Sequence, residues 1–384
     1  MSKVSINETT LTAIGDAIRE KTGKTDLIAP GEMPAEIKAI ETGGGELPEE
    51  ALVLTKNCSS KFCGNNWNWF INTYGDKITT KDITSAEKLF YESDTLTTIP
   101  FDFNFDSVNA SYATMMFAYC GNLTSIGKIV NFKVGQMSGF FQACYRLRVL
   151  PEFINLDTTT MNKNTTANLR IFNNCYSLRS IPEDLLKRIY TTTTSTYSHH
   201  FYDMFTNDAS LDEIRGLSPQ GGQTLTSNVF QNTFSQCARV KEIIFDTQED
   251  GTPYAVKWKS QTISLTGAVG NCLNNLMYRN YMISYNSGIT TDKEVKDDAT
   301  YQALKNDADW YTLNAAYSRY NHDSAVNTIN SLPDASAYLA TAGGTNTIQF
   351  RGAAGELTDG GAINTLTEEE IAVATAKGWT VTLV

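Results

Sequence analysis

Histidine and recognisable catalytic motifs are nearly missing from this chain. Its 384 residues include three histidines, and two of them, His199 and His200, stand in a threonine- and tyrosine-rich stretch without a nearby cysteine or acidic pair at metal-ligand spacing. No G-x-S-x-G nucleophile motif, P-loop or dinucleotide fingerprint occurs. We therefore predict that the protein is not an enzyme and has no catalytic residue, metal site or cofactor.

Positive charge and long apolar runs are scarce as well. The chain has 31 Lys and Arg against 42 Asp and Glu, a formal net charge of −11, and no cluster of basic residues. Because nucleic-acid affinity depends largely on neutralising phosphates, we expect no nucleic-acid partner. No apolar run of about 18 residues exists to enter a membrane, and the first residues lack the apolar core of a secretion signal. These absences predict a protein that stays in the cytosol where it is made until something releases it.

What the sequence does contain is a repeat. Phenylalanine is followed, in steps of three residues, by a small or polar residue, by Leu or Val, and by Ile or Leu. The pattern occurs six times, and its phenylalanines lie 24 to 33 residues apart, within the range of stacked repeat architectures. The predicted repeat core is Phe90, Phe117, Cys120, Phe141, Cys144, Phe172, Cys175, Phe205, Phe234 and Cys237.

We expect each copy of the repeat to form one structural unit. The i, i+3, i+6 spacing is that of one or two helical turns, and the alternation of Ile99, Phe101, Phe103 and Phe105 after the first copy is that of a strand. The seven cysteines are an odd number and cannot all pair, and four of them share one repeat register. We expect those four to be buried thiols that fill a small-residue position, rather than metal ligands or disulfides.

The chain divides into five predicted segments. Residues 1–42 form a helical module, 43–46 a glycine-rich linker, 47–85 an N-terminal cap, 86–250 the repeats, and 251–384 degenerate repeats with a C-terminal cap. Two short helices cannot bury their own apolar stripes, so the stripe of the first module is predicted to be an attachment or oligomerisation surface. Its members are Leu11, Ile14, Ile18, Ile37 and Ile40.

Two groups of aromatic residues are candidates for receptor or glycan contact. Residues 66–70 alternate like a strand, which places Trp67 and Trp69 on one face, where they either stack on sugar rings or pack on the first repeat. The second group lies in an inter-repeat insertion, and loops on a rigid scaffold often carry binding residues. Its members are Tyr197, His199, His200 and Tyr202.

The last 60 residues predict a closing cap. Asp323 caps a helix that ends at Leu332, and residues 347–350 read as a strand. Thr367 and Glu370 have the spacing of a capping box at the start of another helix, and residues 379–383 alternate as a terminal strand.

The repeat resembles a known family. Residues 116–126 are similar to the BspA-type leucine-rich repeat of bacterial surface proteins and phage proteins, over about residues 86–245. Residues 10–23 with 32–37 resemble the N-terminal module of tail and baseplate-associated proteins of phages that infect Gram-positive bacteria, and residues 322–324, 366–371 and 377–381 resemble the closing segment of such proteins. The resemblance implies an α/β leucine-rich-repeat solenoid with a small helical N-terminal module and a C-terminal cap. It implies no catalytic residues.

The expected function is that of a phage virion structural protein. The resemblance implies a component of a tail, baseplate or fibre, assembled in the host cytoplasm, that displays its repeat body to a bacterial surface glycan or protein. Expected partners are other virion proteins and further copies of the chain. Two alternatives stay open: a bacterial cell-surface adhesin, and a tail-associated polysaccharide depolymerase.

Overall fold

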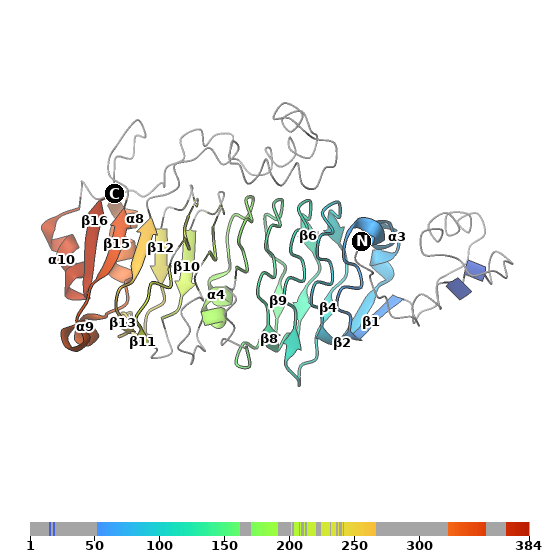
Figure 1. The fold of residues 1–384 in the computed structure, drawn as a ribbon, viewed down its shortest axis with the longest axis horizontal. Helices are drawn as coiled ribbons and strands as arrows, with labels where there is room; N and C mark the ends of the chain where they lie inside the picture. Colours follow the sequence, from blue (N-terminus) through green and yellow to red (C-terminus); the bar gives the residue numbers. More distant parts are fainter. Residues whose placement is uncertain are drawn as a thin grey trace, which may run out of the picture.

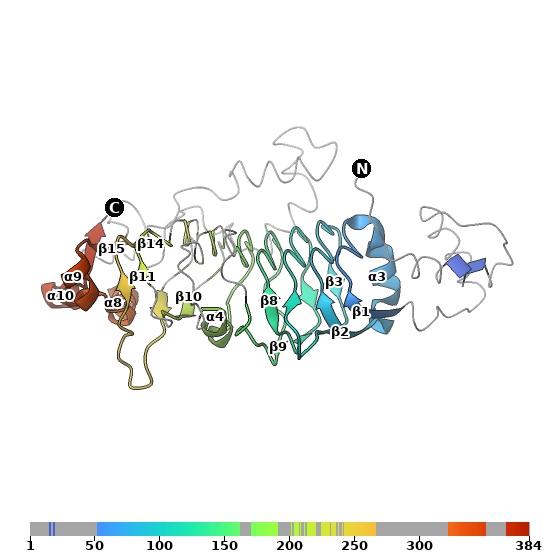
Figure 2. The ribbon, with the colours of Figure 1, turned by 60° about the horizontal axis from the view of Figure 1, so that its bottom comes forward.

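The computed structural model describes residues 52–161, 170–190, 201–265 with short gaps, 322–350 and 366–383, together with Gly15, Asp16, Ile18 and Arg19. The described body is elongated, and the chain runs along its long axis from the N-terminal to the C-terminal end in successive turns (Figure 1). We call this succession of turns the array. Seen from a second side, the turns keep the same order, with helices at both ends (Figure 2).

Short strands from successive turns pair side by side. In the N-terminal half the strands are β1 (Val53–Asn57), β2 (Thr79–Ser85), β3 (Thr98–Ile99), β4 (Phe103–Asn104), β5 (Ser111–Tyr112), β6 (Ser125–Ile126), β7 (Ile129–Val130), β8 (Val134–Gln136) and β9 (Phe153–Ile154). In the C-terminal half they are β10 (Glu213–Leu217), β11 (Thr224–Leu225), β12 (Glu242–Phe245), β13 (Lys257–Trp258), β14 (Thr262–Leu265), β15 (Asn346–Phe350) and β16 (Trp379–Leu383).

The strands form narrow parallel sheets. The sheet orders are β1-β2-β5-β8, β3-β6, β4-β7-β9, β10-β12, β11-β13 and β14-β15-β16. Within the β4-β7-β9 sheet, Phe103 pairs with Ile129 and Ile129 with Phe153, in parallel. One turn of chain therefore separates neighbouring strands.

Stacked phenylalanine rings run through the interior. Phe90 and Phe117 have ring centroids 5.8 Å apart, and the Phe172 and Phe205 rings are 6.0 Å apart and within 2° of parallel. The other neighbours in the repeat stack in the same way, which joins all six into one continuous core. We call this set the Phe column: Phe90, Phe117, Phe141, Phe172, Phe205 and Phe234. Phe62, which the repeat pattern did not include, extends it at 5.5 Å from Phe90.

The prediction that each copy begins with a helical turn is wrong. These segments are consecutive tight turns, in which the Cys120 amide donates to the Phe117 carbonyl and the Leu123 amide to the Cys120 carbonyl. Between them, Tyr119 has a φ of 64°, a left-handed conformation that a right-handed helix does not contain. Its amide donates to the Gln142 carbonyl of the next turn at 2.8 Å. Hydrogen bonds between turns thus replace the bonds of a helix.

In the described residues from 52 onward, helices occur at the ends of the array and at one point along it. They are the 3-10 turn η2 (Asn65–Trp67), α3 (Asn68–Tyr74), the 3-10 turn η3 (Gly75–Lys77), α4 (Glu183–Tyr190), α8 (His322–Ser331), α9 (Ser336–Ala342) and α10 (Glu368–Ala376). The predicted strand over residues 66–70 is therefore wrong, because η2 and α3 occupy it. Phe70 and Ile71 of α3 are buried against the first turns.

The C-terminal end follows the sequence prediction closely. The predicted helix is α8 and the predicted strands are β15 and β16, but α8 begins at His322, so Asp323 lies within its first turn and is not the capping residue. The capping box is confirmed: the Thr367 amide donates to Glu370 Oε2 at 2.8 Å, and the Glu370 amide donates to Thr367 Oγ1 at 3.2 Å. Trp379 is buried and donates its indole N–H to the Pro333 carbonyl at 2.8 Å.

Removing one ring from the Phe column should weaken the whole array. We expect Phe117→Ala to lower the free energy of unfolding by about 3–5 kcal/mol, because a buried aromatic is lost and a cavity opens between two stacked rings. Val149, which is 70% exposed, gives the control Val149→Ala, expected to stay within about 0.5 kcal/mol of the parent. Urea unfolding followed by circular dichroism measures both, and equal effects would contradict the assigned role of the column.

Candidate functional site

The two tryptophans proposed for sugar stacking lie at the N-terminal end of the array. The Trp67 ring packs edge-on against Phe62 at 5.9 Å, and the Trp69 ring packs edge-on against Phe70 at 5.7 Å. Both are partly buried against the core. Both tryptophans belong to helical turns, in which side chains two residues apart point about 200° from each other around the axis. The prediction that they share one face is therefore wrong. Receptor contact by either ring stays a prediction.

Most other candidate residues lie outside the described part of the chain. These are Leu11, Ile14, Ile37, Ile40, Tyr197, His199, His200 and Tyr202. Ile18 is described and is fully buried within the chain. Ile18 is therefore not itself exposed, and the role of the stripe as an attachment or oligomerisation surface stays a prediction.

The cysteines of the repeat lie inside the array and make a specific contact. Cys120, Cys144, Cys175 and Cys237 are buried. Each thiol donates to the carbonyl of the phenylalanine one turn earlier, for example Cys144 Sγ to the Phe117 oxygen at 3.2 Å. Burial raises the pKa of each of the first three thiols well above its ordinary value. These groups therefore serve packing and hydrogen bonding, and are poor nucleophiles.

Thiol reactivity should follow this burial. Of the six described cysteines, Cys63 alone is partly exposed, and its pKa is raised by burial and by Glu92. We expect iodoacetamide to label Cys63 before the other described cysteines, faster as the pH rises towards its pKa, while Cys144 stays unlabelled until the protein unfolds. Peptide mass spectrometry measures both rates. Equal labelling of Cys63 and Cys144 in the native protein would contradict this arrangement.

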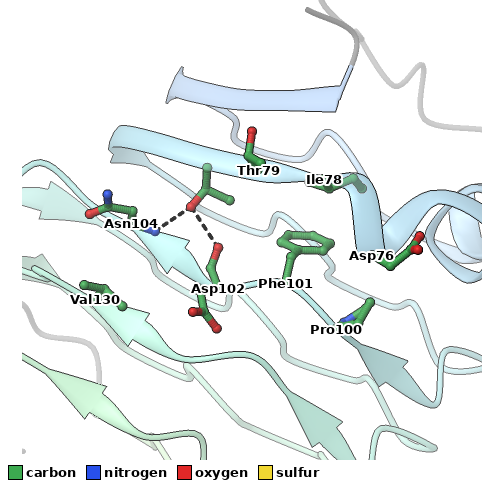
Figure 3. Close-up of a pocket in the computed structure, with 9 residues that line it drawn as sticks. Asp76, Ile78, Thr79, Pro100, Phe101, Asp102, Asn104 and Val130 are labelled. Atoms are coloured by element: carbon green, nitrogen blue, oxygen red, sulfur yellow. Dashed lines mark hydrogen bonds between the residues drawn. The ribbon is translucent and has the colours of Figure 1, made fainter. Parts of the chain in front are cut away.

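An open groove lies on the outer side of the first turns, where β2, β4 and β7 meet (Figure 3). It encloses about 490 Å³. Its apolar surface comes from Pro100, which is exposed, and Val130, which is half-buried, whereas Ile78 and Phe101 line it but are almost fully buried. Its rim carries carboxylate, hydroxyl and amide groups. The lining residues are Asp76, Ile78, Thr79, Thr80, Pro100, Phe101, Asp102, Asn104 and Val130.

Hydrogen bonds fix the walls of the groove. Thr80 Oγ1 donates to the Asp102 carbonyl at 2.8 Å and accepts from the Asn104 amide at 2.6 Å, which ties β2 to β4 (Figure 3). Asp102 Oδ1 accepts from the Lys128 amide at 2.7 Å, which ties the second turn to the third. The positions of Asp102 and Asn104 are therefore set by backbone contacts.

Two polar rows continue from the groove across the β4-β7-β9 sheet. Asn131 Nδ2 donates to Asn104 Oδ1 at 3.0 Å, and Asn155 Nδ2 donates to Asn131 Oδ1 at 2.9 Å. One residue before each strand stands a charged side chain, and Lys128 pairs with Glu152 at 2.9 Å. That hydrogen bond raises the pKa of the Lys128 ammonium. The rows present amide and charged groups at the spacing of the turns.

The groove is acidic. Asp76 and Asp102 line it, and neither carboxylate forms a salt bridge within the described ranges. In that part of the chain, no group of three or more His, Cys, Asp and Glu is placed to hold a metal ion. A ligand that donates hydrogen bonds from hydroxyl or amino groups suits these acceptors, while a phosphate-rich ligand would be repelled.

This site was missed from the sequence, although part of it has a signal. Asn104, Asn131 and Asn155 recur at intervals of 27 and 24 residues, the intervals of the first three members of the Phe column. Asp76 and Thr79 have no such periodicity, because they come from the N-terminal cap.

Comparison with protein-family models, with curated proteins and with solved structures finds no match to this chain. Among the described helices, none is both long enough and apolar enough to cross a bilayer.

Proposed function

We propose that this chain is a structural protein of a phage virion, a tail, baseplate or fibre component whose array contacts the bacterial envelope. In this proposal the array is a BspA-type leucine-rich-repeat solenoid, and the N-terminal module joins other virion proteins or further copies of the chain. The observation that carries the proposal is the open groove with its polar rows, which repeat at the spacing of the turns on a rigid body.

The chemistry of the groove favours a wall glycan as the ligand. Apolar surface at Pro100 and Val130 beside carboxylate, amide and hydroxyl groups suits a sugar, which offers an apolar ring face and many hydroxyl donors. An open groove binds one short stretch weakly. Many copies on one particle raise the total avidity without a deep pocket, because each further contact is intramolecular.

Changing the rim of the groove tests the contact directly. We expect Asp76→Ala combined with Thr79→Val to weaken binding of the full chain to purified host cell-wall glycan about fivefold or more, since each lost hydrogen bond contributes about 1 kcal/mol. Co-sedimentation over a range of glycan concentrations measures this. Glu249→Gln removes one exposed carboxylate away from the groove and should leave binding unchanged.

The outcomes of that experiment separate the alternatives. Equal binding by the parent and the rim variant would reject the groove as the contact. Absence of binding by the parent would reject envelope binding by this chain. Release of soluble oligosaccharides from the glycan would instead indicate a depolymerase, and native protein in host cell-wall fractions without particles would indicate an adhesin.

Deleting the N-terminal module tests the proposed attachment. Without residues 1–42 the array should still fold, because the described core begins at Leu54, but the protein should no longer join particles. Circular dichroism checks folding, and immunoblots of purified virions check incorporation. Incorporation of the folded truncated protein at the parent level would show that the module does not attach the chain.

A further inference from the structure

The position three residues after each member of the Phe column has a constant hydrogen-bonding role, and we call it the inner slot. In five of the six copies its side chain donates to a backbone carbonyl of the preceding turn, at the phenylalanine that stacks in the column. The bonds are Ser93 Oγ to Phe62 O at 2.8 Å, Cys120 Sγ to Phe90 O at 3.0 Å, Cys144 Sγ to Phe117 O at 3.2 Å, Cys175 Sγ to Phe141 O at 3.1 Å, and Cys237 Sγ to Phe205 O at 2.9 Å. The slot therefore takes a small donor.

Asp208 occupies the inner slot of the fifth copy and breaks this rule. Its side chain is fully buried. Oδ1 accepts from the Cys175 amide at 2.8 Å, and Oδ2 has no hydrogen-bond partner. By analogy with the other copies, a donor at position 208 would bond to the carbonyl of Phe172, the phenylalanine one turn earlier. An ionised carboxylate has no proton to donate to it, whereas a neutral carboxylic acid has one.

Among the described residues, no opposite charge offsets the burial of Asp208. The inner slots before and after Asp208 hold the thiols of Cys175 and Cys237, both buried and both neutral hydrogen-bond donors. The rings of Phe172, Phe205 and Phe234 stack past this point of the core. Burial raises the pKa of Asp208 well above its ordinary value, and the Cys175 amide opposes this only in part. No lysine, arginine or histidine in the described residues contributes to that balance.

We propose that Asp208 is a protonation-controlled lock in the array: the fold is built around its neutral acid form, and ionisation loosens the stacking of the fifth copy on the fourth. The neutral form keeps Oδ1 on the Cys175 amide and carries a proton on Oδ2 for the slot's carbonyl. The ionised form leaves an unpaired charge in an apolar core, which costs free energy.

The direction of the pH dependence follows from this. Because the pKa of Asp208 is higher in the folded than in the unfolded chain, the folded state binds the proton more tightly. Stability from this group is full below the ordinary pKa of an aspartate and is lost as the pH rises through the folded-state pKa. Asp106, Asp157 and Asp250 have lowered pKa values and act in the opposite direction at acidic pH.

Asp208→Asn isolates this effect, because asparagine keeps an acceptor oxygen and supplies a permanent N–H donor. Urea unfolding of the full chain and of D208N is compared between about pH 5 and 9, above the ordinary aspartate pKa. We expect the unfolding constant of the parent to rise relative to that of D208N by up to tenfold per pH unit, until the pH reaches the folded-state pKa. Asp208→Cys restores the thiol of the other copies and serves as the comparison should D208N not fold.

A control and a local measurement complete the test. Asp250→Asn changes an exposed aspartate with a lowered pKa. The ratio of the parent's unfolding constant to that of D250N should therefore not change over this pH range. If the fourth and fifth copies loosen, the rate of hydrogen exchange at the Cys175 amide should rise with pH more steeply in the parent than in D208N. A ratio of the parent's unfolding constant to that of D208N that is independent of pH, or that falls as the pH rises, would overturn the proposal.

Discussion

Hydrogen bonds between the backbones of successive turns decide which side chains the interior of this array accepts. The Phe117 amide donates forward to the Phe140 carbonyl at 3.0 Å, and the Phe141 amide donates forward to the Ile171 carbonyl at 2.9 Å. Inner-slot side chains donate in the opposite direction, to the phenylalanine carbonyl one turn back. The backbone amides and carbonyls of a turn are therefore all hydrogen-bonded only when another turn lies on each side of it. This explains why α3 and the β14-β15-β16 sheet with its helices stand at the two ends (Figure 1).

The sequence predicted those parts of the interior that depend on side chains in register. The Phe column and the thiols recur at intervals set by the length of a turn, so their periodicity is visible. The conformation of the turn was not predictable from the same pattern, because a spacing of three residues fits both a helix and consecutive tight turns. The residues that decide between them, such as Tyr119 and Ala143, are left-handed without being glycine and give no local signal.

Contacts between distant segments were also beyond the sequence. β14 pairs with β15 through Ile263 and Ile348, which lie 85 residues apart, so no local pattern joins them. The groove has the same origin, because Asp76 and Thr79 come from the N-terminal cap while Asn104 belongs to the first repeat. The row of asparagines beside it was predictable in principle, since it shares the intervals of the Phe column. A search for polar residues at those intervals would have found it.

The close approach of backbones makes the groove a prearranged surface. At Gly127 a Cβ atom would lie 2.0 Å from the Phe101 carbonyl oxygen, so glycine alone lets these two turns come together. Phe101 lines the groove, and Asp102 and Asn104 are held by hydrogen bonds between neighbouring turns. A ligand therefore meets groups that lose little conformational freedom on binding. Under the proposed virion function, weak binding by each copy would suffice on a multivalent particle, because little of the contact energy would be spent on ordering the protein.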